Sequence, residues 1–121
     1  MTVSEVIEKV KDLKPNAYKD HTLLDWLNEI EAMVQRDLMD TAPEGIREYR
    51  IEKDMEEELI LPRPFNALYE TYLIMRIEFN QQEFTAYNNT AELFNTQFEE
   101  AQKYYNEKYP KTKKLKIKNY M

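Results

Sequence analysis

Apolar residues recur every three or four positions in four stretches of the chain, and this spacing predicts four helices. The first stretch begins with a capping-box pattern, in which Thr2 can cap the helix and Glu5 can reach back to it. The second stretch runs from about residue 20 to residue 38 and carries Trp26 and Leu27 on a broad apolar stripe. Both patterns are typical of amphipathic helices that turn one face towards a core.

Two more helices are predicted in the second half of the chain. The third begins at about Pro64 or Phe65, because proline suits the first position of a helix, and a short break is expected at residues 80–82. The fourth is predicted from about residue 83 to residue 108, roughly 38 Å at 1.5 Å per residue. Its apolar and aromatic positions alternate spacings of three and four, which is typical of close helix pairing. These positions are Phe84, Tyr87, Ala91, Phe94, Phe98, Ala101 and Tyr105.

The segment between the second and third helices lacks helical spacing. Residues 46–61 alternate weakly between apolar and polar, include an acidic run at 54–58 and stop before Pro62. Proline biases the residue before it towards extended structure, so this stretch predicts a long connection with two short strands.

The sequence as a whole predicts an all-α fold. A four-helix bundle-like domain is expected over residues 1–109, with a long last helix and an irregular or extended connection between the second and third helices. An extended basic C-terminal tail follows over residues 110–121, where lysines alternate with Leu115, Ile117 and Tyr120.

Composition narrows the chemistry that the chain can perform. Gly45 is the only glycine and there is no cysteine. A Gly-rich nucleotide loop needs two or more glycines, and disulfides, thiolate catalysis and cysteine-based zinc sites all need cysteine. No run of about 18 apolar residues is present, so no membrane span is expected.

The charge is distributed unevenly along the chain. The net charge is −6, yet six of the 17 basic residues lie in residues 108–121, which contain no acid. The preceding 107 residues therefore carry 11 basic against 23 acidic residues, a net charge of −12. An acidic body with a basic tail predicts two different electrostatic partners, or association of tail with body.

Few residues suggest catalysis or metal binding. His21 and Asp25 could hold a metal weakly, but a metal site needs three or four converging ligands and the chain has no second histidine. Acidic runs such as residues 56–58 and 99–100 are typical of solvated faces rather than of a carboxylate pair in a pocket. The aromatic stripes favour core packing over a cofactor site. We therefore expect no enzymatic activity, no cofactor and no metal.

The lysine tail is open to three interpretations. It is a solubilising end, or it binds an acidic protein surface or adds a strand to a neighbour, or it contacts DNA phosphates in a salt-sensitive way. The last interpretation makes the chain a helical DNA-binding protein, and the second makes it a general protein-interaction adaptor. These remain alternatives at this point.

The order of several short motifs resembles one family. The motifs are Leu59-Ile-Leu-Pro-Arg-Pro-Phe65, Leu68-Tyr69-Glu-Thr-Tyr72-Leu73, Glu83-Phe-Thr-Ala-Tyr87-Asn88-Asn89, and Phe94-Asn95 with Phe98; Lys14-Pro15-Asn16 and the stretch Leu23-Leu24-Asp25-Trp26-Leu27-Asn28-Glu29-Ile30 precede them. Together they resemble the head–tail connector, or head-completion adaptor, proteins of siphophages and prophages of Gram-positive bacteria. The likeness covers most of residues 10–109, and the segment 44–58 and the tail match only in general character.

The resemblance implies a structural virion protein. Such a protein forms a ring of about twelve-fold symmetry beneath the portal, joins head to tail and continues the DNA channel. Its partners would be the portal protein, neighbouring copies, the next head-completion or tail protein and the packaged DNA, with no membrane. It would be found at the head–tail junction of the virion and in the host cytoplasm during assembly.

The candidate residues fall into two sets. Core and motif positions are Trp26, Leu27, Leu61, Pro62, Tyr69, Tyr72, Tyr87, Asn88, Phe94 and Phe98. Contacts with neighbouring subunits or partners are expected from segment 46–61 and from the tail, through Arg47, Tyr49, Arg50, Lys113, Lys114, Lys116 and Lys118.

Overall fold

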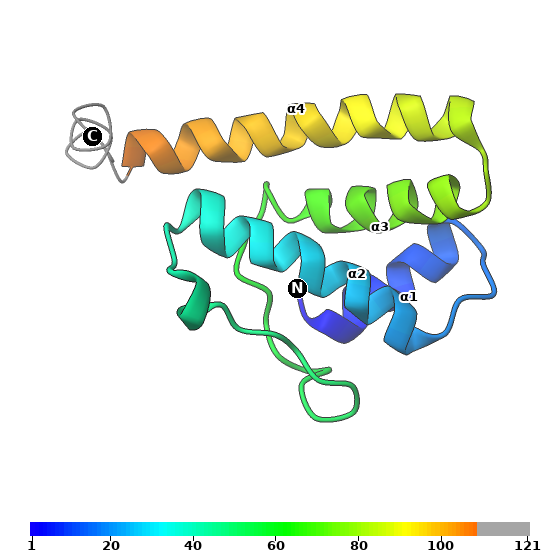
Figure 1. Ribbon diagram of the computed structural model, residues 1–121, viewed down its shortest axis with the longest axis horizontal. Coiled ribbons are helices and arrows are strands. Elements are labelled where there is room, and N and C mark those ends of the chain that lie inside the picture. The colour runs from blue at the N-terminus through cyan, green and yellow to red at the C-terminus, as the bar shows by residue number, and fades with distance from the viewer. Residues whose placement is uncertain (109–121) are drawn as a thin grey trace.

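The computed structural model describes residues 1–108 and contains four α-helices (Figure 1). They are α1 (Val3–Leu13), α2 (Asp20–Met33), α3 (Ala67–Asn80) and α4 (Phe84–Lys108). A π-helical turn, η1 (Val34–Leu38), continues α2, and a short 3-10 turn, η2 (Pro43–Gly45), follows it. The predicted all-α, four-helix fold is confirmed. The predicted tail, residues 110–121, lies outside the described residues.

The expectation of two short strands in residues 46–61 is wrong. Within residues 1–108 the segment forms only an isolated antiparallel bridge, between Thr2 and Glu58. The segment is extended nevertheless, and we call residues 46–61 the arm. The first part of the arm, which contains Arg47 and Tyr49, is its outgoing limb, and the part after the turn at Asp54 is its returning limb. The backbone of the outgoing limb is hydrogen-bonded to side chains of α2 and η1 rather than to a second strand, as described below.

The capping box at the start of α1 is confirmed. The Glu5 backbone N–H donates to the Thr2 hydroxyl at 3.2 Å, and the Thr2 N–H donates to the Glu5 carboxylate at 3.1 Å. These two bonds satisfy backbone donors that a helix start leaves without partners. The bond from the Thr2 N–H to the carboxylate, followed by the Thr2 side chain, lowers the pKa of the exposed Glu5 carboxyl, because it favours the charged form.

The second and third helices differ from prediction at their ends. The predicted helix over residues 20–38 widens into η1 after Met33, where the Met39 N–H donates to the carbonyl of Val34, five residues back. The third helix begins at Ala67, not at Pro64 or Phe65. The preceding residues form a turn instead, in which the N–H groups of Phe65 and Asn66 both donate to the carbonyl of Pro62.

Helix α3 lies between α4 on one side and α1 with α2 on the other (Figure 1). Most of the core is formed by α1, α2 and α3, whose inward side chains include Ile7, Leu27 and Leu73, all at most 1% exposed. The predicted break at residues 80–82 is present, and Gln82 adopts a positive φ of 61° there. Figure 1 shows the arm on the opposite side of this core from α4.

Helix α4 is covered on one side only. Of its seven predicted apolar positions, only Phe94, Ala101 and Tyr105 are buried, whereas Phe84 is 53% exposed. Helix α4 has 25 residues and α3 has 14, about 38 Å against about 21 Å at 1.5 Å per residue. The heptad spacing therefore predicts the helix correctly but overstates how much of it a partner within the chain covers.

Candidate functional site

The outgoing limb of the arm is held to the α2–η1 helix by two amide side chains. The Tyr49 N–H donates to Asn28 Oδ1 at 2.8 Å, and Asn28 Nδ2 donates to the Tyr49 carbonyl at 3.0 Å. Gln35 forms the same pair of bonds with Arg47: the Arg47 N–H donates to Gln35 Oε1 at 2.9 Å, and Gln35 Nε2 donates to the Arg47 carbonyl at 3.0 Å. The two amides thus replace the neighbouring strand that an extended chain normally needs for its backbone groups.

Glu31 lies between these two amides on α2 and is fully buried, at 0% exposure. Its Oε2 accepts from the Tyr49 hydroxyl at 2.8 Å and from the Ile60 backbone N–H at 3.0 Å. Its Oε1 accepts from the Tyr69 hydroxyl at 2.5 Å. Bonds to a carboxylate are stronger than bonds between neutral groups, so this one side chain ties both limbs of the arm to α2 and α3.

Both tyrosines at Glu31 are held in their neutral form. Burial is the largest cause that raises the pKa of Tyr69 well above its usual range, and the Glu31 charge is the next. The same two causes raise the pKa of Tyr49, with Arg47 acting in the opposite direction. The Tyr69 hydroxyl also accepts from the Leu61 N–H at 3.0 Å, which fixes the end of the arm against α3.

The returning limb of the arm pairs with the first residues of the chain. The Val3 and Ser4 N–H groups donate to the carbonyls of Glu57 and Met55, at 3.1 Å and 2.8 Å. These are donors at the start of α1, so the limb satisfies groups that the helix itself leaves unpaired. Both limbs are therefore anchored, and the tip between them projects from the body (Figure 1).

The arm tip is a tight turn around Asp54. The Arg50 N–H donates to the Asp54 carboxylate at 2.8 Å, and the Asp54 N–H donates back to the Arg50 carbonyl at 3.0 Å. Glu52, at the turn, adopts a φ of 67°, a conformation that strains residues other than glycine. Ile51 is 42% exposed, and Arg50 and Lys53 are exposed beside it in sequence.

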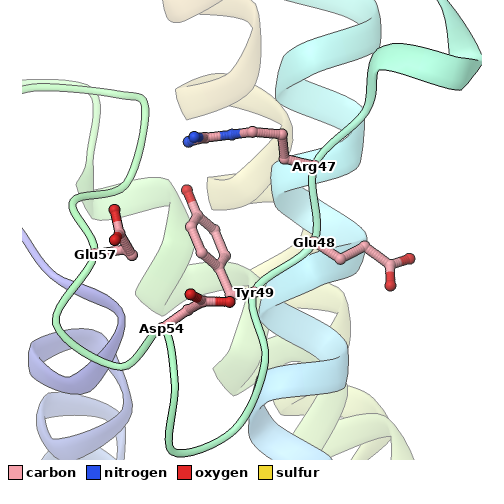
Figure 2. A pocket seen from close by; sticks show the side chains of 5 residues that line it. All are labelled: Arg47, Glu48, Tyr49, Asp54 and Glu57. Atoms are coloured by element: carbon pink, nitrogen blue, oxygen red, sulfur yellow. The ribbon is translucent and has the colours of Figure 1, made fainter.

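A hollow of about 340 Å³ lies behind the tip, between the two limbs. Figure 2 shows the Tyr49 ring lying between the limbs, with Asp54 and Glu57 coming from the returning limb and Glu48 pointing away. The lining is mostly charged, and the ring of Tyr49 is its aromatic part. The hydroxyl of that ring is already bonded to Glu31. We therefore interpret the hollow as the space left between the two anchored limbs and not as an independent binding site.

A second groove of about 340 Å³ lies between α3 and α4 and is lined by Tyr72, Met75, Arg76, Phe79 and Tyr87. Arg76 donates to Glu29 at 2.9 Å and its guanidinium lies 5.4 Å from the centre of the Trp26 ring. Phe79 is 52% exposed and packs against the rings of Phe84 and Tyr87. The Glu29 carboxylate also accepts from the Tyr72 hydroxyl, and burial with this bond raises the pKa of Tyr72 to about 12.

The outer face of α4 carries charges of both signs. Glu92, Glu99, Glu100 and Lys103 are exposed there, and Leu93, next to the buried Phe94 in sequence, is 51% exposed. No ion pair within residues 1–108 involves these three glutamates. The face of α4 that α3 leaves uncovered is thus a charged surface of mixed sign.

The structure distributes the predicted core and motif residues unevenly. Six of them are buried, and Tyr87 and Phe98 are partly covered on α4. Pro62 and Asn88 are exposed, so these two motif positions do not contribute to the core. The buried six are Trp26, Leu27, Leu61, Tyr69, Tyr72 and Phe94.

The predicted partner contacts also separate into groups. Arg47 and Arg50 are exposed, whereas Tyr49 is only 6% exposed and binds Glu31 of its own chain. Tyr49 is therefore used for an internal contact, which corrects its assignment to a neighbouring subunit. The predicted contacts Lys113, Lys114, Lys116 and Lys118 lie outside the described residues.

Sequence reasoning missed the three polar residues that hold the arm. The sequence pattern places Glu31 and Gln35 at polar positions between apolar ones, yet both are buried. The available signal was their spacing with Asn28, since steps of three and four put all three on one stripe of a helix. A polar stripe of this kind also fits a solvated face, so the spacing alone does not decide between the two.

Neither a metal site nor a membrane span is found in residues 1–108. No group of three or more potential ligands could hold a metal ion in this part of the chain, so the His21 and Asp25 pair gains no third partner there. No helix in the same range is long and apolar enough to cross a membrane. Comparisons of the chain with family models, with characterised proteins and with solved structures give no match.

Proposed function

We propose that the chain is a ring-forming structural subunit that joins the head of a tailed phage to its tail. The order of motifs that resembles the head–tail connector family supports this role. The observation that carries it is the presence of two unlike surfaces, the projecting arm tip and the uncovered face of α4, on opposite sides of one rigid core (Figure 1).

A ring needs two such surfaces on every subunit. Contacts in a ring are head-to-tail, so one surface of each copy meets a different surface of the next. A twofold dimer would need only one self-complementary patch. The anchoring of both limbs supports this use of the arm, because a braced projection can present its tip in one position without a large ordering cost.

The role is tested by mixing the purified chain with isolated portal rings from the same genome, or with tailless capsids, and imaging the particles. A new ring of density below the portal is the expected result, and it gives the symmetry directly. A folded chain that leaves portals bare contradicts the proposal. A chain lacking residues 110–121 separates the tail from the body: unchanged assembly removes the tail from the contacts.

The lysine-rich tail supports one alternative function, binding of DNA by the free chain. Retention of DNA that weakens steeply as salt rises, and that is lost with residues 110–121, would favour it. The connector role instead predicts portal binding in which DNA is not required.

A further inference from the structure

The outgoing limb of the arm has one open backbone edge. The N–H and C=O groups of Arg47 and Tyr49 are bonded to the side chains of Gln35 and Asn28. In an extended chain, consecutive residues direct these groups to opposite edges, so those of Glu48 point away from α2 and η1. Within residues 1–108, neither the N–H nor the C=O of Glu48 has a hydrogen-bond partner. An edge of this kind accepts a further extended segment as an added strand.

The chain after Lys108 has the sequence pattern of such a segment. From Lys114 to Lys118, lysines alternate with Leu115 and Ile117, which is typical of a strand. Residues 109–121 contain five lysines and no acid. The arm contains six acidic and three basic residues, a net charge of −3, which becomes −2 when the amino terminus that Glu58 binds is included. The net charges of the two segments are therefore opposite, although the arm itself carries both signs.

The position of Lys108 brings this segment within reach of the limb. Figure 1 shows η1 beneath the last turns of α4, and the two elements are in contact. Gln35 of η1 binds Arg47 of the limb on its other side. A helix with its side chains is roughly 10–12 Å wide. The eight residues 109–116 span up to about 26 Å when extended, so the distance around η1 can be bridged within one chain.

We propose that residues 114–118 of the same chain lie along the open edge of the limb as a short added strand, hydrogen-bonded to the N–H and C=O of Glu48. When Ile117 lies beside the ring of Tyr49, the alternation places a lysine beside the Glu48 carboxylate in either strand direction. The hollow between the limbs leaves room for the apolar side chain next to that ring (Figure 2). This contact goes beyond the connector role and does not depend on it.

The contact is weak in itself and is favoured by the covalent connection. It involves the backbone of one limb residue and exposed ion pairs, which contribute little each and are screened by salt. A segment joined to its site by a short linker is present there at an effective concentration in the millimolar range. The consequence is protective, because an open edge that is already covered cannot pair with the same edge of another copy.

Hydrogen exchange measures the contact at single backbone amides. The amide of Glu48 should exchange several-fold more slowly in the full chain than in a chain that lacks residues 110–121. The amides of Arg47 and Tyr49 are internal controls, because their acceptors are the side chains of Gln35 and Asn28. They should be unchanged, which also shows that the shortened chain is folded. Equal exchange of the Glu48 amide in the two chains overturns the proposal.

Two exchanges of neighbouring side chains separate strand pairing from simple attraction of charges. Lys116→Ile/Ile117→Lys keeps the composition and the net charge but breaks the alternation, so the Glu48 amide should exchange as fast as in the shortened chain. Leu115→Ile/Ile117→Leu keeps the alternation as well and should leave the slow exchange in place. If both variants slow the exchange equally, the attraction is only electrostatic and the added strand is overturned.

Disulfide trapping decides whether the segment belongs to the same chain, which has no cysteine of its own. In Glu48→Cys/Lys116→Cys, mild oxidation should give mainly monomers with an internal bond. It should do so several-fold faster than in Glu44→Cys/Lys116→Cys, where the first position is exposed and lies before the arm. Equal rates mean random collision and contradict the proposal. A product that consists mainly of linked dimers assigns the segment to another copy and overturns the contact within one chain.

Discussion

The two sides of the core are joined by different kinds of interaction. The arm is attached to α2 and η1 through the polar side chains of Asn28, Glu31 and Gln35. These side chains form hydrogen bonds with backbone groups of the arm and with the Tyr49 hydroxyl. Helix α4 is attached to α3 through rings, with Phe94 5.4 Å from Tyr72 and Tyr87 5.3 Å from Phe79 between ring centres. Hydrogen bonds select one position of the arm, whereas apolar packing supplies stability with less dependence on exact alignment.

The largest effect should come from the apolar side. Phe94→Ala removes a ring that is only 6% exposed and should lower the free energy of unfolding by about 3 kcal/mol. Urea denaturation measures this loss. Hydrogen exchange at the amides of Arg47 and Tyr49 should become faster only by as much as the lower global stability requires, because the acceptors of these amides lie on α2 and η1. Selective loss of protection in the arm would contradict the division between the two sides.

Glu31→Ala should have a slightly smaller global effect and a large local one. It leaves the Tyr69 hydroxyl and the Ile60 N–H without their acceptor and leaves the Tyr49 hydroxyl only its 3.4 Å bond to the Glu58 carbonyl, which should cost about 2 to 3 kcal/mol. The arm should then exchange its amide protons and be cut by protease much faster than α4. Glu8→Ala, at an exposed position on α1, is the control and should change neither measurement. An arm that stays protected in Glu31→Ala would show that Glu31 does not hold it.

Alkaline pH should weaken the arm side through its tyrosines. The folded-state pKa of Tyr49 and of Tyr69 is raised above the usual 10.0, so their contribution to stability is complete below about pH 10 and is lost as pH rises further. Tyr72, near α4, has its pKa raised to about 12 and loses its contribution between about pH 10 and pH 12. Ultraviolet titration of tyrosinate, followed together with unfolding, checks this. Tyr69→Phe should remove part of the pH dependence, and an unchanged profile would contradict the prediction.

The smallest effect concerns the arm tip. Glu52→Gly relieves a φ of 67° but adds freedom to the unfolded chain, so a net stabilisation of about 0.5 kcal/mol is expected. Glu48→Gly, at an exposed position of the arm with no positive φ, should instead destabilise. Thermal unfolding of the two variants side by side gives the comparison, and equal shifts would remove the case for strain at the tip.

The sequence predicted those features that depend on neighbouring residues. The capping box at Thr2 and Glu5 and the long helix ending at Lys108 follow from local spacing, and both are present. The burial of Glu31 depends on Tyr49 and Tyr69, which are 18 and 38 positions away, so no local pattern could reveal it. The arm was mistaken for strands because weak alternation fits any extended chain, including one whose partners are side chains.

The candidate surfaces show the same division. Exposure of Arg47 and Arg50 follows from charge, and the prediction of an accessible arm holds for them. Tyr49 faces Glu31, because alternation in an extended chain sends its side chain to the face opposite that of its neighbour Glu48 (Figure 2). The exposure of Leu93 agrees with its position outside the heptad stripe, next to Phe94, which packs against Tyr72 of α3.

The two pairs of hydrogen bonds from the amide side chains of Asn28 and Gln35 constrain how the length of the arm can change in evolution. Asn28 and Gln35 stand about 10 Å apart along the helix, and they hold Tyr49 and Arg47, about 7 Å apart in an extended chain running the opposite way. An inserted or deleted residue between positions 47 and 49 would break one of the two pairs of hydrogen bonds. Insertions before position 47 or around the tip would leave both engaged. Relatives of this chain should therefore vary in length on either side of residues 47–49 and keep that interval constant.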